Sequence, residues 1–196
     1  LSARIMTETT DAKSVLRRRL IADRIAASAA RPEAGERLVD HFAPNWRPRA
    51  GMVVAGYHPL PHEIDPGPLM ASFAAAGAQL CLPVVQGRDR PLVFRCWRAG
   101  DTLEARAFGV KEPADRAPEA VPDLVLVPLV GVDRQGVRLG FGAGYYDRTL
   151  ARLRKAGEVR VVGLAYPEQC VDRLPCEDHD ERLDALVTDE GWQAFP

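Results

Sequence analysis

The sequence predicts an α/β fold in which an open, largely parallel central sheet is flanked by helices. Helical and strand-like segments alternate along the chain, without internal repeats or low-complexity tracts. The strand-like segments are short apolar runs, as expected of buried strands. At 196 residues the chain is long enough for one domain with a substantial core. We expect that domain to span residues 7–196, with residues 1–6 a disordered start or a vector-derived remnant.

Helices are expected at 10–29, 32–42, 66–76 and 145–156. Pro32 and Pro66 suit the first turn of a helix, whereas Gly77 and Gly157 suit positions just past a helix end. Strands are expected at 51–57, 79–85, 92–97, 124–128, 159–165 and 185–188. Residues 86–122, rich in Pro, Arg and Asp, break the alternation and predict a hairpin and a long surface loop.

Composition narrows the class of partner and the compartment. The net charge of −1 provides no field that would draw the chain to nucleic acid or to an anionic membrane. No apolar run approaches the length of a bilayer, and the start carries no secretory signal. Four cysteines without C-x-x-C spacing favour neither a zinc site nor a disulfide framework, so we expect a cytoplasmic protein.

The first predicted helix carries cations on its apolar side. At 100° per residue, one half of the helical wheel holds Leu16, Leu20, Ile21, Ile25 and Ala27. Lys13 and Arg17 fall in the same half, whereas Arg18 and Arg19 lie opposite and are expected to be solvated. Two readings remain open. The cations either extend their charges to water past a packed stem, or they line a cleft that holds an anion.

A second signal lies between residues 124 and 155. An apolar run, Leu124 to Leu129, predicts a buried strand, and a helical segment begins at residue 145. Between them, every second residue is glycine, at positions 140, 142 and 144. Such a loop lets backbone N–H groups gather at the start of a helix, where anions bind. With Arg138 before it and Asp147 in the first helical turn, it is a candidate cradle for a phosphate and its metal.

The alternative for this segment is a glycine-rich turn before an ordinary helix, with Asp147 complementing the helix dipole. The string lacks the Gly-Lys-Ser/Thr ending of a P-loop and the spacing of a dinucleotide fingerprint.

As a whole, RLGFGAGYYDR at 138–148 closely resembles the signature of the 5-formyltetrahydrofolate cyclo-ligases, also called methenyltetrahydrofolate synthetases. Pro128 and Asp133 match the strand end and the turn that precede this signature. Ala143 departs from relatives that carry Gly or Lys there, so any role of a lysine at that position is absent. The resemblance covers most of residues 10–189 and is weakest across 86–122.

The resemblance implies a fold similar to the ribose-5-phosphate isomerase and CoA-transferase group. It also implies that Lys13 and Arg17, as the family's Lys-x-x-x-Arg, contact ATP phosphates, and that with Arg138 they form the catalytic cations. The implied ATP-binding residues are Lys13, Arg17, Arg138, Leu139, Gly140, Gly142, Gly144 and Tyr146.

For the folate, the matching segment is VVAGYHPLPHEID at 53–65. Glu63, six residues beyond Tyr57, takes the place of the family's folate-contacting glutamate, and His58 opens the loop. On the residues alone, Glu63 is an ordinary loop carboxylate, and His58 or His62 a surface histidine. The implied substrate-binding residues are His58, Glu63, Phe141 and Tyr145.

For the metal, PCEDHDERLDALVT at 175–188 resembles the family's closing segment. The resemblance assigns Asp180 to hold Mg²⁺ together with Asp147, and this ion accepts one or two carboxylates alongside phosphates. Asp178, Asp184 and Asp189 crowd the same stretch, which could instead be a charged, solvent-facing turn.

The activity that the resemblance implies is ATP- and Mg²⁺-dependent conversion of 5-formyltetrahydrofolate to 5,10-methenyltetrahydrofolate, with release of ADP and phosphate. The expected partners are reduced folate and ATP, and we expect a monomer. The main alternative is a non-catalytic relative that binds folate or nucleotide on the same fold. A sugar-phosphate isomerase is a third possibility, favoured only by the general fold.

Overall fold

A computed structural model of the chain describes residues 2–106 and 109–196, with side chains of the first helix from residue 12 onward. The helices are α1 (Ser2–Ala30), α2 (Ala34–His41), α3 (Gly67–Ala75) and α4 (Tyr145–Ala156). They confirm the four predicted helices, although α1 begins eight residues earlier than expected and includes residues 2–6, the start that we expect to be disordered or vector-derived. Position 1 of that start lies outside the described residues. None of the described helices is long and apolar enough to cross a membrane.

The main sheet has eight strands in the order β13-β12-β10-β7-β1-β2-β3-β6. Their bounds are β1 (Val53–Ala55), β2 (Gln79–Val84), β3 (Val93–Cys96), β6 (Glu119–Ala120), β7 (Leu124–Pro128), β10 (Arg160–Ala165), β12 (Ala185–Thr188) and β13 (Gly191–Ala194). The five central strands, from β12 to β2, run parallel, and the edge strands pair antiparallel. The predicted fold class is confirmed.

Several short strands were not predicted. A small sheet joins β11 (Cys170–Val171), β8 (Gly131–Asp133) and β9 (Arg138–Leu139), and a separate hairpin pairs β4 (Leu103–Ala105) with β5 (Lys111–Pro113). Strands of two or three residues carry no readable periodicity, which is why the pattern missed them. Residues 86–122, where a hairpin and a long surface loop are predicted, contain β3, β6 and that separate hairpin, so the loop is shorter than predicted; positions 107 and 108 lie outside the described residues.

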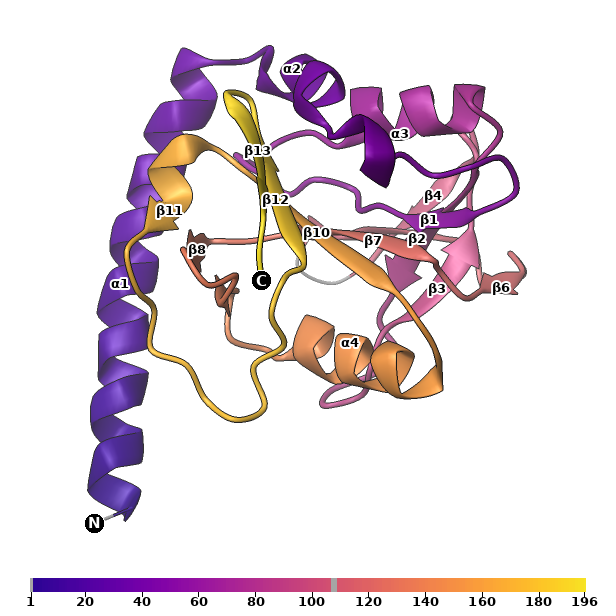
Figure 1. The fold of residues 1–196 in the computed structure, drawn as a ribbon. Coiled ribbons are helices and arrows are strands. Elements are labelled where there is room, and N and C mark those ends of the chain that lie inside the picture. Colours follow the sequence, from indigo (N-terminus) through magenta and orange to yellow (C-terminus); the bar gives the residue numbers. More distant parts are fainter. Residues whose placement is uncertain (1, 107–108) are drawn as a thin grey trace.

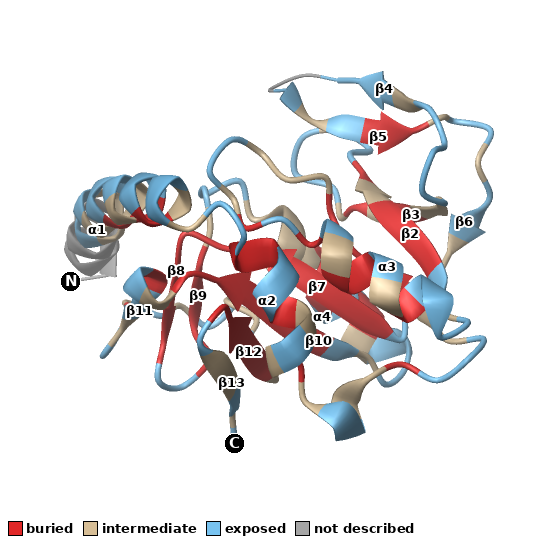
Figure 2. Ribbon diagram, turned by 90° about the horizontal axis from the view of Figure 1, so that it is seen from above, coloured by how far each residue is buried: buried red, intermediate tan, exposed pale blue. Residues whose placement is uncertain are grey.

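Helices cover both faces of the main sheet (Figure 1). On one face, Leu38 of α2, Phe42 just after it and Phe73 of α3 belong to an apolar cluster with the strands. On the other, α4 contributes Leu150 and Leu153 to a second cluster. Seen from above, the buried strands lie beneath α2 and α3 (Figure 2). The sheet is therefore the middle of three layers, as expected of strands with apolar residues on both faces.

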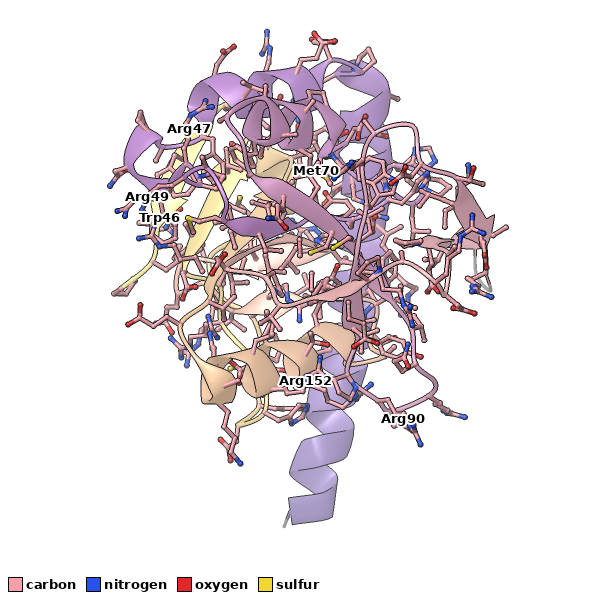
Figure 3. The ribbon with its side chains drawn as sticks, turned by 90° about the vertical axis from the view of Figure 1, so that its right-hand side faces the viewer. Trp46, Arg47, Arg49, Met70, Arg90 and Arg152 are labelled. Atoms are coloured by element: carbon pink, nitrogen blue, oxygen red, sulfur yellow. The ribbon has the colours of Figure 1, made fainter. Side chains whose placement is uncertain are left out.

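Met70 of α3 and Arg152 of α4 lie on opposite sides of the sheet (Figure 3), and each closely approaches the backbone next to a strand. A Cβ at Gly56, just after β1, would lie 2.1 Å from the sulfur of Met70 on α3, so a larger residue there would displace the Met70 side chain. On the opposite face, Arg152 of α4 donates to the carbonyl of Leu92, 2.7 Å away, beside the start of β3.

Helix α1 stands beside the small sheet, at one side of the domain (Figure 1). Leu20 is fully buried against Val130, Val137 and Leu139, and a Cβ at Gly131 would lie 2.5 Å from a Leu20 methyl. The prediction that Ile25 belongs to the packed side was wrong, because this residue is 42% exposed. The prediction assigned half of the helix to the packed side, whereas the packed face is narrower than that.

The carboxyl ends of the parallel strands meet at the edge that faces α1. The loop 56–66 follows β1, the turn Pro167–Gln169 (η3) follows β10, and the small sheet with the glycine loop follows β7. Helix α1 packs against η3, and Arg24 of α1 contacts the carbonyl of Leu129 just beyond β7. Ligands of open α/β sheets bind outside the carboxyl ends of the strands, so this edge is where a site is expected.

Candidate active site

The predicted glycine loop, residues 140–144, lies between β9 and α4. Gly142 has φ +101°, and Gly144, the N-cap of α4, has φ +66°. Both angles lie in the left-handed region, which glycine adopts readily and β-branched residues do not. Since Gly144 offers no side chain as a cap, the first N–H groups of α4 are left for another acceptor. The loop therefore has the backbone features of an anion site.

Lys13 and Arg17 both point from α1 to this region. The Nε of Arg17 donates to the carbonyl of Gly140 over 2.8 Å, and its guanidinium lies 3.5 Å from the position of a Cβ on Gly142. The Nζ of Lys13 lies 2.9 Å from Asp180 and 3.5 Å from Glu177. Neither cation extends to open water in the structure, because each is engaged by the loop or by the closing segment.

Arg138 and Asp147 form an ion pair behind the loop. The Nη2 of Arg138 donates to Oδ1 of Asp147 over 2.8 Å, and the Arg138 side chain is buried. Its guanidinium also lies over the ring of Tyr146, 5.6 Å from the centroid. The backbone N–H of Glu181 donates to the same Asp147 oxygen over 3.3 Å. Asp147 is thus placed next to the closing segment as well as next to a buried cation.

The closing segment gathers further oxygen donors. Oδ2 of Asp180 accepts hydrogen bonds from Lys13 and from the backbone N–H of Glu177. Glu177, His179 and Asp180 each offer a ligand atom, and these atoms all lie within 4.8 Å of one another. Asp180 was predicted as a metal ligand, whereas Glu177 and His179 were not. The available signal was three potential ligands within four residues of an acidic turn, but such a sequence does not distinguish metal ligands from solvated charges.

Glu63 lies in the loop after β1 and is almost fully buried. Its Oε2 accepts the backbone N–H of Leu60 over 2.9 Å, and its Oε1 lies 3.6 Å from the Nη1 of Arg24. Burial raises the pKa of the Glu63 carboxyl, while the Leu60 hydrogen bond and the charge of Arg24 lower it. Glu63 is therefore not the ordinary surface carboxylate that its residue type alone indicates.

Two histidines of this loop differ. The Nδ1 of His58 is buried and has no hydrogen-bond partner among the described residues. His62 has φ +67°, and its Nδ1 lies 3.0 Å from the hydroxyl of Ser28 on α1. Tyr57 donates from its hydroxyl to the carbonyl of Ile64 over 2.8 Å. The loop is thus fastened at several points, and His58 is left with an unused polar atom.

The aromatic residues of the signature have different surroundings. Phe141 is 52% exposed, and its ring lies 5.3 Å from the guanidinium of Arg24. Burial raises the pKa of the Tyr146 hydroxyl, and the negative charge of Glu63 raises it further. Tyr145 is half-buried beneath the guanidinium of Arg148. Phe141 is accordingly the aromatic surface that is most available to a ligand.

Leu139 does not reach the loop with its side chain. It packs with Leu20 in the cluster beneath α1, and its carbonyl accepts the N–H of Val130 over 2.8 Å. The signature residue Asp133 is also structural, since its carboxylate accepts the N–H groups of Gln135, Val137 and Leu174.

Arg24 was not predicted as a site residue. It lies seven residues, almost two full turns, beyond Arg17, which places it on the same ridge of α1. Its side chain is only 4% exposed and contacts Glu63. The helical wheel of α1 places Arg24 beside Arg17, but only the apolar residues and the Lys-x-x-x-Arg pair on that side were interpreted.

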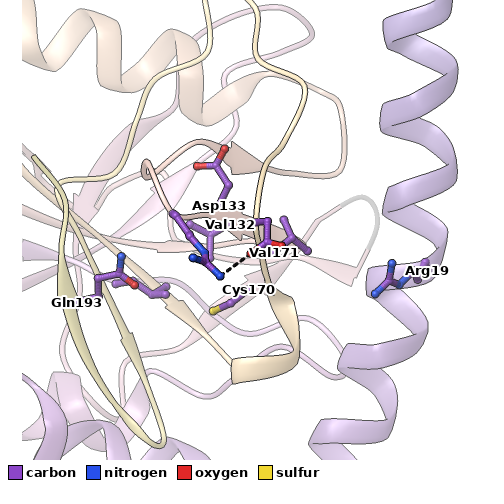
Figure 4. Close-up of a pocket in the computed structure, with 9 residues that line it drawn as sticks. Arg19, Val132, Asp133, Cys170, Val171 and Gln193 are labelled. Carbon is purple, nitrogen blue, oxygen red and sulfur yellow. Dashed lines mark ion pairs between the residues drawn. The ribbon is translucent and has the colours of Figure 1, made fainter.

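A cavity of about 470 Å³ lies away from these residues, beside the small sheet (Figure 4). It is lined by Arg19, Cys170 and Gln193, among others, and by none of the predicted site residues. A second cavity of about 750 Å³ lies beside the β4-β5 hairpin.

The sequence of the chain matches a known protein family. A sequence model described as the 5-formyltetrahydrofolate cyclo-ligase family matches residues 9–189. The 5-formyltetrahydrofolate cyclo-ligase of Mycolicibacterium smegmatis is 36% identical over 149 residues, which cover 71% of this chain and 74% of that protein. The enzyme of the same name from Escherichia coli is 34% identical over 131 residues, covering 64% and 71% respectively.

Solved structures agree. The NMR structure of Aquifex aeolicus 5,10-methenyltetrahydrofolate synthetase superposes with a TM-score of 0.75 at 31% identity, covering 93% of this chain and 92% of that one. A 5,10-methenyltetrahydrofolate synthetase from Mycoplasma pneumoniae has a TM-score of 0.69 at 24% identity, covering 90% and 98%. The second likeness supports the fold alone.

Proposed function

Since the chain belongs to the 5-formyltetrahydrofolate cyclo-ligase family, and is thus an enzyme and not a non-catalytic relative, we propose the reaction that it catalyses. It converts 5-formyltetrahydrofolate and ATP to 5,10-methenyltetrahydrofolate, ADP and phosphate, with Mg²⁺ as the metal. The observation that carries this proposal is the pair of contacts that α1 makes through its cations: Arg17 contacts the glycine loop, and Lys13 contacts the acidic closing segment.

The chemical problem is that an amide oxygen is a poor leaving group. In the proposed reaction the formyl oxygen attacks the γ-phosphorus of ATP, and the bond from that phosphorus to the ADP oxygen breaks. N10 of the folate then attacks the formyl carbon and loses its proton. The carbon–oxygen bond breaks last, so phosphate leaves and the methenyl bridge remains. No covalent nucleophile of the protein is required, and catalysis depends on positioning and charge stabilisation.

In this scheme the phosphates of ATP bind between the cations of α1 and the glycine loop. Lys13 and Arg17 neutralise phosphate oxygens, and the backbone N–H groups of the loop and of the first turn of α4 donate to them. Arg138 is buried and already paired with Asp147, so we assign it an indirect part: it holds Asp147 and the base of the loop in place. Lys13 exchanges Asp180 for a phosphate oxygen when ATP binds.

The residues present fit a magnesium ion. Mg²⁺ prefers oxygen ligands and keeps several waters, so one or two carboxylates suffice. Asp147 and Asp180 would hold it, because the backbone N–H of Glu181, next to Asp180, contacts the Asp147 carboxylate. Bound there, the ion would offset negative charge on the phosphate oxygens. Glu177 is a further oxygen donor in the same cluster.

On the folate side, Glu63 accepts a hydrogen bond from the pterin or from the formyl region. His58 supplies a polar atom that no described residue uses, and Phe141 supplies an exposed aromatic face. Tyr145 lies at the boundary of the two substrates. The partners of the enzyme are then small molecules, reduced folate and ATP, and we propose that it acts as a cytoplasmic monomer.

The direct test mixes the protein with 5-formyltetrahydrofolate and Mg-ATP and follows the absorbance of the methenyl product. We expect one ADP and one phosphate per methenylfolate formed, and no product when ATP or Mg²⁺ is omitted. Product without ATP, or ATP consumption without product, would contradict the proposal.

A further inference from the structure

Helix α1 carries three cations along one ridge, and only two of them belong to the predicted phosphate site. Lys13, Arg17 and Arg24 follow one another at intervals of four and seven residues, and Arg31 comes seven residues later, just past the last residue of α1. Such intervals return to nearly the same face of a helix. Arg31 pairs with Glu168 and with the fully buried Asp189, at the end of the helix. Arg24 lies between the phosphate end and this outer pair.

Arg24 is enclosed by the loop after β1 and by the glycine loop. Its Nη1 lies 3.6 Å from Oε1 of Glu63 and 3.5 Å from the carbonyl of Leu129. Its guanidinium faces the ring of Phe141, and its Nε has no partner among the described residues. Both side chains of the pair are 4% exposed. Arg24 therefore touches a residue from each of the two loops that the proposed substrates need.

A pair this deeply buried is not explained by stability. The desolvation of two charges commonly exceeds their mutual attraction, so an apolar pair of similar volume would stabilise the fold as well or better. The Glu63 carboxylate is further held by a single backbone N–H, that of Leu60. The charge of Arg24 lowers the pKa of Glu63 against the opposing effect of burial. Arg24 thus favours the form of Glu63 that accepts hydrogen bonds.

We propose that Arg24 is a positioning residue: it holds Glu63 as a carboxylate, aimed at N–H donors of the reduced folate, through the ion pair between α1 and the loop after β1. Its contact with Phe141 fixes the exposed aromatic face beside that carboxylate. Because this inference rests on the proposed function of Glu63 as a folate contact, the experiment must separate the two.

The experiment measures binding of 5-formyltetrahydrofolate by calorimetry to the wild type, Arg24→Met, Glu63→Gln and the double variant. We expect either single change to weaken folate binding about tenfold or more, the cost of losing a charge-assisted contact. In a protein that already carries Glu63→Gln, we expect Arg24→Met to weaken folate binding by less than a further factor of about two, because the effects of two residues that act together are not additive. Binding of Mg-ATP should change less than about twofold in Arg24→Met.

Arg31→Met is the matched control, because it removes another arginine, one residue past α1, that also faces a buried carboxylate. It should lower the melting temperature as Arg24→Met does and leave folate binding unchanged. Arg24→Lys keeps the charge and should recover part of the affinity. If Arg24→Met does not fold, Arg24→Lys takes its place, with a smaller loss that again disappears beside Glu63→Gln.

The outcomes separate the two claims. If Glu63→Gln binds folate normally, Glu63 is not a folate contact and that part of the proposed function fails. If Glu63→Gln weakens binding but the Arg24 change has no effect, or adds its full effect in the double variant, the positioning role alone is overturned. An equal loss of folate affinity in Arg31→Met would reduce the role of Arg24 to general support of α1.

Discussion

The two ends of the cation ridge on α1 are built differently. At the phosphate end, the side chains of Lys13 and Asp180 are 15% and 11% exposed, and Lys13 has two carboxylate partners. At the folate end, Arg24 and Glu63 are both 4% exposed and the pair is single. Partly exposed charges with several partners can exchange them at a small cost in free energy. A buried ion pair cannot, because each charge would be left unpaired away from water. We infer that the phosphate end rearranges on binding and that the folate end is organised beforehand.

This contrast has a consequence for the unliganded enzyme. Lys13 is paired with Asp180, and Arg138 with Asp147, so each proposed metal carboxylate already holds a cation. In the proposed reaction, Mg-ATP would supply the complementary charges: the metal ion for the carboxylates and the phosphates for Lys13. Changes at the phosphate end should therefore affect the use of ATP and leave folate binding intact, and changes at the folate end should do the reverse.

The largest effect is expected from Gly142→Val. At φ +101° a β-branched residue is strained by about 1–3 kcal/mol, although the space itself would admit a Cβ. We expect a folded protein, by circular dichroism, with no ATP-dependent turnover and no calorimetric binding of Mg-ATP. Ala143→Gly and Ala143→Lys are the controls and should be tolerated. A folded Gly142→Val variant that binds Mg-ATP normally would disprove the phosphate cradle.

Next come Lys13→Ala and Arg17→Ala. Loss of a partly buried cation opposite a polyphosphate typically costs about 2–5 kcal/mol of binding. We expect the KM for ATP to rise and turnover to fall in each variant, with folate binding unchanged. Arg18→Ala, on the exposed side of the same helix, is the matched control and should behave as wild type. Unaltered ATP kinetics in both variants would mean that these cations serve only the packing of α1.

Asp147→Asn should have an intermediate effect, seen in the magnesium dependence of turnover. The change also leaves the buried Arg138 without its carboxylate. We therefore expect a lower melting temperature and a loss of unfolding free energy larger than the roughly 0.3–1 kcal/mol that a helix-dipole charge contributes. The informative measurement is turnover against Mg²⁺ concentration. A lower melting temperature with an unchanged magnesium requirement would remove Asp147 from the metal site and leave it as the partner of Arg138.

The smallest effect concerns pH and the folate end. The pKa of Glu63 is raised by burial above its ordinary value of 4.5, so the folded state binds this proton more tightly than the unfolded state does. Its contribution to stability is thus present below pH 4.5 and is lost as the pH rises through the raised pKa. The free energy of unfolding of wild type relative to Glu63→Gln should fall across that window. A difference that rises with pH would show that the pairing with Arg24 outweighs burial.

Much of this fold could be predicted because its long elements have strong periodic patterns. The four helices and the five parallel strands are long or apolar enough for the pattern to be clear. The strand β13 and the small sheet were missed, because their pairing is set by neighbours distant in sequence. Ile25 was misplaced because a wheel shows which half of a helix is apolar but not how wide its partner surface is.

The candidate site was predictable where a motif encodes it. The glycine loop and the Lys13–Arg17 pair were found because backbone freedom and helical spacing leave local signals. Arg24, Glu177 and His179 were not found, since their importance arises from contacts made only in the folded chain. Likewise, nothing in the sequence indicates that Arg138 is held by Asp147 and that Leu139 is buried.

The most direct test of the central claim follows the formyl oxygen. 5-Formyltetrahydrofolate labelled with ¹⁸O in its formyl group is converted with Mg-ATP in unlabelled water, and the phosphate is recovered for mass spectrometry. Since the formyl oxygen attacks the γ-phosphorus and departs with it, we predict one ¹⁸O atom in each phosphate released. Label found in water instead, with none in the phosphate, would contradict phosphoryl transfer to the formyl group and the role that we assign to the glycine loop and its cations.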